Sequence, residues 1–171
     1  LNANSKEAFI LINNWFMVFY LITVLIGTVY PIFTEVISDH KVSVGPPFYN
    51  TVIIPILVLF LFIMSVGPKV KWIKDKFNSF KSLFIILIGA ILINFFIIYF
   101  FKSYSLLSNL IIISSIFLII SSLKDAIQSF KNKNFNFSRV ISHSAFGFFV
   151  LFVGLNHNFS VEKDFNLKLG E

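Results

Sequence analysis

The chain has 171 residues, of which 57% are hydrophobic and 13% are charged, and its mean hydropathy is +0.86. Ordinary soluble domains are about 45–50% apolar, so the composition excludes a fold that covers its surface with charge. The formal net charge is +6, but the basic residues lie between apolar segments rather than together on a solvated face, and we predict no nucleic-acid partner. Because the sequence contains no cysteine, disulfides and thiol-ligated metals are excluded.

Five segments of 20 to 27 residues contain no Asp, Glu, Lys or Arg. A helix needs about 20 mostly apolar residues to cross the roughly 30 Å hydrocarbon core of a bilayer. We therefore predict an all-α, polytopic integral membrane protein with about five transmembrane helices. The membrane region is expected to cover residues 1–156, with spans at residues 9–33, 51–66, 82–101, 105–122 and 140–155.

The links between these spans differ in composition. The run from Val44 to Asn50 is expected to be a fixed loop, because its two consecutive prolines cannot continue a helix. Pro55 would then fall in the first turns of the second span, where a missing N–H costs little. Gly67-Pro68 is expected to end that span. Only Lys102 to Tyr104 separate the third and fourth spans, which predicts an antiparallel hairpin.

The basic residues predict the orientation of the spans. Ten of the 14 lie at one set of span ends and four at the other, and the richer side is usually cytoplasmic. The link from Lys69 to Lys81 is therefore expected in the cytoplasm. We expect the protein in a bacterial inner (plasma) membrane, with the Pro46-Pro47 loop and the C-terminal tail on the periplasmic side. Residues 157–171 are expected to begin a periplasmic domain, and their partly alternating apolar residues favour a strand.

His143 is the one histidine inside a predicted span. Titratable groups in membrane helices are costly and usually face a protein interior or a cofactor. In the helical register Gly147 and Gly154 share a broad face with His143, and Phe146 and Phe149 lie beside that face. A flat macrocycle could lie against it, with a His143 nitrogen as axial ligand to haem iron. Three roles stay open: a hydrogen bond to a neighbouring helix, ligation of haem or another metal, and proton relay.

The other two histidines are poorly placed to be an opposite axial ligand. His157 lies 14 residues further on, about 21 Å along the same helix. His40 falls in a predicted outward loop. A site with two histidine ligands would therefore need a histidine from outside this sequence.

Arg139 is the one arginine among the basic residues and lies one helical turn before His143. It is either an ordinary positive-inside anchor or a residue with a special contact. A guanidinium group suits planar, two-pronged binding of carboxylates. Our hypothesis is that Arg139 pairs with a propionate of a haem held by His143.

Several motifs together resemble the CcmF/NrfE family, the membrane haem lyases of bacterial cytochrome c maturation. They are Ser5-Lys6-Glu7-Ala8 with Asn13-Asn14, Gly27-Thr28-Val29-Tyr30-Pro31 with Glu35, the run from Val42 to Asn50, Ser142-His143, and Phe159-Ser160-Val161-Glu162-Lys163-Asp164. The match runs from residue 5 to about residue 168, and the Gly-Pro-Pro run is its most specific part. This sequence has Ser-His-Ser-Ala where the family usually has Ala-His-Leu-Gly.

The resemblance implies a segment from the C-terminal half of a protein that attaches haem to Cys-x-x-Cys-His motifs of periplasmic apocytochrome c. It also implies a haem b held in the membrane by two histidines, of which His143 matches one. The implied partners are apocytochrome c, haem, membrane lipid, a haem chaperone and an apocytochrome-binding subunit, and quinol is a further candidate. No residue matches a catalyst of thioether formation. The second haem ligand and the family's tryptophan-rich motif would lie outside this sequence.

Two rival interpretations come from other classes of protein. In a transporter or channel segment, His143 and the Pro-Pro loop would line a path, and such sites usually use broken helices near the midplane. In a purely structural assembly subunit, His143 would bind nothing. A haem spectrum separates the first interpretation from both rivals.

Overall fold

The computed structural model describes residues 6–38, 43–69, 80–101, 105–131 and 137–159. These ranges contain five α-helices, each long and apolar enough to cross a membrane. The helices are α1 (Lys6–Ser38), α2 (Pro46–Val66), α3 (Phe80–Phe101), α4 (Leu106–Lys131) and α5 (Phe137–Phe159), with a short 3-10 helix, η1 (Gly67–Lys69), after α2. The prediction of an all-α, multi-pass membrane protein is confirmed.

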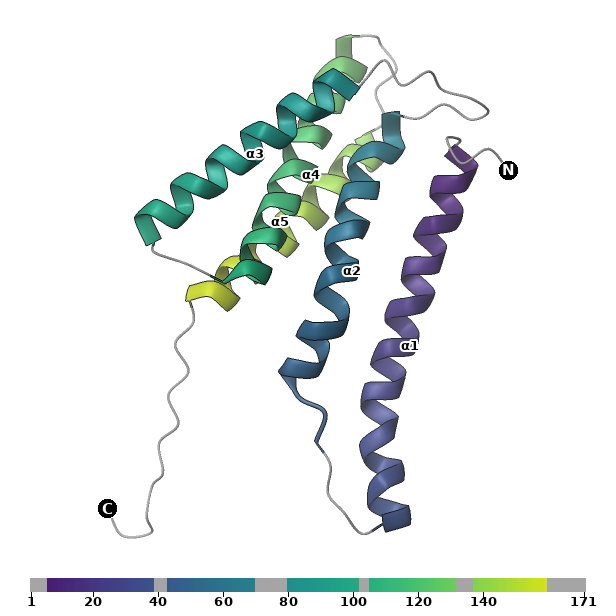
Figure 1. Ribbon diagram of the computed structural model, residues 1–171. Coiled ribbons are helices and arrows are strands. Elements are labelled where there is room, and N and C mark those ends of the chain that lie inside the picture. Colours follow the sequence, from purple (N-terminus) through teal and green to yellow (C-terminus); the bar gives the residue numbers. More distant parts are fainter. Residues whose placement is uncertain (1–5, 39–42, 70–79, 102–104, 132–136, 160–171) are drawn as a thin grey trace.

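Successive helices run in opposite directions, so the bundle has an up-and-down topology (Figure 1). α1 and α3 lie on opposite sides of the bundle, with α2, α4 and α5 between them (Figure 1). The start of α3, the end of α4 and the start of α5 therefore meet at one end of the bundle. This end carries the described basic residues Lys81, Lys124, Lys131 and Arg139.

α2 begins earlier than the sequence predicts. Gly45 is extended (φ −106°, ψ −174°), and both Pro46 and Pro47 lie in the first turn of the helix. The Phe48 N–H donates to the Gly45 carbonyl at 3.1 Å. Prolines are tolerated here because the first N–H groups of a helix have no intrahelical acceptor. The predicted loop up to Asn50 was therefore wrong, and Pro55 lies inside the helix rather than in its first turns.

The other helices differ from the predicted spans mainly in length, because they continue beyond the apolar core. α1, α4 and α5 each extend past their spans, and α2 ends at the predicted glycine, Gly67. α3 and α4 pack against each other as the predicted hairpin requires. The link at 102–104, most of the basic link (70–79), the loop at 39–42 and the predicted strand in 160–171 lie outside the described residues.

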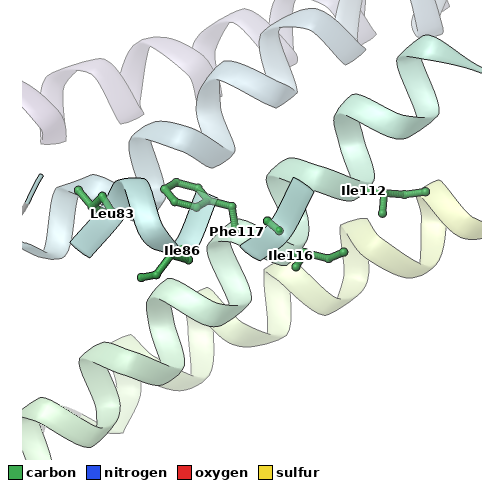
Figure 2. Packing of buried hydrophobic residues seen from close by; sticks show 6 residues of the cluster. Leu83, Ile86, Ile112, Ile116 and Phe117 are labelled. Atoms are coloured by element: carbon green, nitrogen blue, oxygen red, sulfur yellow. The ribbon is translucent and has the colours of Figure 1, made fainter. Parts of the chain in front are cut away.

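α4 is the central helix of the bundle and contacts α2, α3 and α5. In an apolar stretch of 18 residues, 61% of the α4 residues are buried, compared with 6% of the α1 residues. α1 packs beside α2 and η1. Figure 2 shows the α3–α4 side of this packing, where Leu83 and Ile86 meet Ile112, Ile116 and Phe117. A second cluster joins α4 to α2 and α5 through Ile54, Leu61, Ile111, Leu118 and Val150.

Two glycines of α5 bring that helix close to α4. A Cβ atom added to Gly147 would lie 2.7 Å from Ile119 Cγ1, and one added to Gly154 would lie 2.9 Å from Ile111 Cγ2. Small residues allow such close approach of membrane helices, and this approach supplies the van der Waals packing that holds them together.

We expect Gly147→Ala to destabilise the bundle by about 1–3 kcal/mol, because the new methyl group overpacks the α4–α5 contact. Gly89→Ala is the matched control, since nothing lies within 4 Å of a Cβ at Gly89. The free energy of unfolding, measured by denaturing-detergent titration in micelles, compares the two variants. Equal effects of the two substitutions would contradict the packing described for α5.

Candidate functional site

The His143 ring is oriented by its own helix. Nδ1 lies 2.9 Å from the carbonyl oxygen of Arg139, one turn earlier in α5, and the side chain is half-buried. A carbonyl can only accept a hydrogen bond, so Nδ1 carries the proton and donates it. In the neutral ring this leaves the lone pair on Nε2. Histidines that bind metals usually have this arrangement, with the second nitrogen donating to a carbonyl or carboxylate.

His143 and Arg139 line one open cavity of about 270 Å³ between α1, the end of α2 and the start of α5. The sequence placed these two residues on one helical face, and the structure brings them to the same cavity. Seven further residues complete its lining: Phe9, Ile10, Asn13, Ile63, Met64, Gly67 and Pro68. The cavity is therefore mainly apolar, with an imidazole and a guanidinium on one wall.

Buried serines hold this part of α5 against its neighbours. The hydroxyl groups of Ser122 and Ser144 lie 3.0 Å apart, and Ser122 also donates to the Val140 carbonyl at 3.3 Å. Ser121 donates to the Ser65 carbonyl of α2 at 3.0 Å. The Ser122 bonds fix how α5 is rotated against α4, and with it the position of His143, while the Ser121 bond ties α4 to α2.

These serines were not among the residues predicted from the sequence. The sequence does contain a pattern that points to them. Two serine pairs, Ser114-Ser115 and Ser121-Ser122, lie seven residues apart in an otherwise apolar span. A seven-residue repeat returns to nearly the same helical face, and polar residues in a membrane helix usually face protein. All four serines are buried in the structure.

A small void on the α4 side of His143 is also polar. It measures about 10 Å³ and is lined in part by Ser121, Ser122, Asp125, Arg139 and His143. That volume is about enough for one water molecule. The void is too small for a cofactor, whereas the larger cavity has about 270 Å³ of space beside His143.

The predicted binding face for a macrocycle was wrong. Gly147 and Gly154 are buried against α4, so their face of α5 is already occupied by protein. Phe146 packs edge-on against Phe60 of α2, with ring centroids 5.9 Å apart. The sequence could not show which face of α5 meets α4, because apolar residues surround most of the helix.

His157 lies at the opposite end of α5 from Arg139, with its Nε2 3.4 Å from Asn50 Nδ2. It does not line the His143 cavity, and His40 lies outside the described residues. Within the described ranges, no three His, Cys, Asp or Glu side chains gather where they could hold a metal ion. A metal bound by His143 would thus need a macrocycle or a ligand from elsewhere.

The sequence is similar to curated proteins of cytochrome c biogenesis. It is 27% identical over 98% of its length to cytochrome c-type biogenesis protein CcmF of Haemophilus influenzae, covering 28% of that protein. It is 25% identical to CcmF of Escherichia coli over 98% of this chain and 27% of that protein. Over nearly its whole length, the chain is therefore similar to a segment of CcmF proteins. It spans between a quarter and a third of the length of these CcmF proteins.

A shorter match to CcmF of Pseudomonas fluorescens is 39% identical over 71 residues, 42% of this chain and 11% of that protein. No family model matches the sequence. Among solved structures, the cytochrome c haem lyase CcmF superposes with a TM-score of 0.67 at 19% identity. The superposition covers 93% of this chain and 26% of the CcmF chain, so the two share the fold of this region.

Proposed function

We propose that this chain is part of a membrane haem lyase subunit that attaches haem to periplasmic apocytochrome c and holds a b-type haem at His143. The names of the CcmF relatives support the first part of the proposal. One observation carries the second: His143 donates from Nδ1 to the Arg139 carbonyl and lines an open cavity. Its Nε2 therefore has the protonation state that binds iron.

The residues around the cavity fit a haem. Haem is a flat apolar ring with two carboxylates, and the cavity offers apolar walls with one guanidinium. When bound, haem supplies one-electron redox chemistry through its iron. The Arg139 carbonyl fixes the imidazole tautomer, and the guanidinium side chain offers a cation to a propionate. Ile63 and Met64 are apolar lining residues against which the haem ring would lie. A second axial ligand would come from outside this sequence.

The proposed partners are those of cytochrome c maturation: apocytochrome c, a haem chaperone, an apocytochrome-binding subunit and, as electron donor, quinol. The proposed location is the bacterial inner membrane. The described basic residues support the proposed orientation, because they gather at one end of the bundle, which we assign to the cytoplasm. His143 then lies near the cytoplasmic end and His157 near the periplasmic end.

The transporter interpretation gains no support from the helices. Pro31 and Pro55 lie inside α1 and α2, and each helix continues on both sides of its proline. Transporter sites usually use helices that are unwound at the substrate. The described spans contain no such break.

We expect His143→Ala to abolish the reduced b-type absorbance spectrum of the protein, expressed from its complete gene and purified in detergent. The reason is the loss of the iron-binding nitrogen. His157→Ala is the matched control on the same helix and should keep the wild-type spectrum. An unchanged spectrum in His143→Ala would move the ligand elsewhere. A haem-free wild type, from cells supplied with haem, would favour the transporter or structural interpretation.

Arg139→Lys should increase the rate of haem loss about tenfold, because lysine cannot make the two-pronged contact with a propionate. Tenfold corresponds to about 1.4 kcal/mol, near the lower end for a hydrogen bond to a charged group. Transfer of haem to an excess of apomyoglobin measures the rate. Lys124→Arg controls for a general change of basic residues at this end. A wild-type rate and spectrum in Arg139→Lys would contradict the propionate contact.

The proposed orientation predicts the behaviour of reporter fusions. Alkaline phosphatase is active only outside the cytoplasm, so a fusion within residues 70–79 should be inactive and one within residues 39–42 active. Green fluorescent protein fusions at the same positions should give the reverse pattern. Activity of the phosphatase at residues 70–79 would invert the assignment of both ends.

A further inference from the structure

Asn13 of α1 lines the same cavity as His143 and Arg139. Its side chain is half-buried, and its amide has no hydrogen-bond partner in the part of the chain that the structure describes. The other α1 and α2 residues that line the cavity, such as Phe9 and Ile63, are apolar. Asn13 is therefore the polar group that α1 contributes to the cavity.

The amide of Asn13 is available to a ligand in the cavity. Asn13 is half-buried where it lines the cavity, and polar side chains in membrane helices usually serve a site. The neighbouring Asn14 is exposed and does not line the cavity. Consecutive helical residues point about 100° apart. The two asparagines therefore differ in the one property that matters here, which is access to the cavity.

The three polar side chains at the cavity have complementary abilities. His143 offers a lone pair for iron, Arg139 offers a cation, and Asn13 offers a neutral donor from a different helix. A ligand with one metal ion and two carboxylates would use all three. The Asn13 amide can direct such a ligand from the α1 side because its two N–H bonds have a fixed geometry.

We propose that Asn13 donates a hydrogen bond to a carboxylate of the haem that His143 holds, and that it sets the orientation of this haem against α1. The inference rests on the proposed function, since it needs a haem at His143. The ligand would then bridge α1 and α5. α1 has the least buried span of the bundle and packs mainly beside α2 and η1, so the bridge would add an attachment that protein contacts do not supply.

The test compares Asn13→Leu with Asn14→Leu in protein expressed from its complete gene and purified with its haem. Asn13→Leu should lose haem to apomyoglobin about tenfold faster than the wild type, as expected for one lost hydrogen bond to a charged group. Its midpoint potential should fall, because a carboxylate without its donor stabilises ferric iron. Asn14→Leu should match the wild type in both measurements. Asn13→Gln, which keeps the donor on a longer side chain, should stay closer to the wild type than Asn13→Leu.

Each result decides the question. Equal rates of haem loss in Asn13→Leu and Asn14→Leu would overturn the inference. Equal rates in Asn13→Leu and Asn13→Gln would also overturn it, because they would show that the volume of the side chain matters and its donor does not. If Asn13→Leu does not purify as folded protein, Asn13→Ala replaces it, because alanine has no side-chain donor and suits a helix. A wild-type spectrum in His143→Ala would instead overturn the proposed function and leave Asn13 without a ligand.

Discussion

The close contact between α4 and α5 is the constraint on which the rest of this structure depends. In lipid the hydrophobic effect does not drive helices together, so close packing and interhelical hydrogen bonds must do so. α5 supplies two glycines at this contact, Gly147 and Gly154, each too close to α4 for a side chain. The Ser122 and Ser144 hydroxyls add a polar link. α2 and α3 then pack on the remaining faces of α4.

This contact also decides where His143 can act. Four residues of an α-helix turn through about 400°, so His143 lies only about 40° from Gly147 around the helix. The histidine is thus at the border of the face that α4 covers. One ring nitrogen is tied back to the Arg139 carbonyl, and the ring lines the cavity beside α1 and α2. Among the described residues, packing covers the α4 side of His143 and leaves the side toward α1 and α2 open.

The sequence predicted the helices well and their faces poorly, for one physical reason. Charged residues are excluded from the hydrocarbon core, so the gaps between them mark each span, and all five spans are helical in the structure. Helix ends were harder, because Pro46 and Pro47 read as a loop although the first turn of a helix accepts them. The face of α5 that meets α4 could not be read, since lipid and protein neighbours both favour apolar side chains. The glycines of α5 mark the face that contacts α4, but glycines also suit a flat ligand. The sequence alone did not distinguish the two, and the predicted ligand-binding face was therefore wrong.

The position of His143 along α5 limits what a haem there could do. His143 lies near one end of the helix and His157 near the other, about 21 Å away at 1.5 Å per residue. Haem attachment to a periplasmic apocytochrome would take place beyond the His157 end in the proposed orientation. A haem fixed at His143 could not touch that partner, because most of the membrane lies between them. It would therefore serve as a resident redox centre or a structural bridge to α1, and the haem that is attached would bind elsewhere.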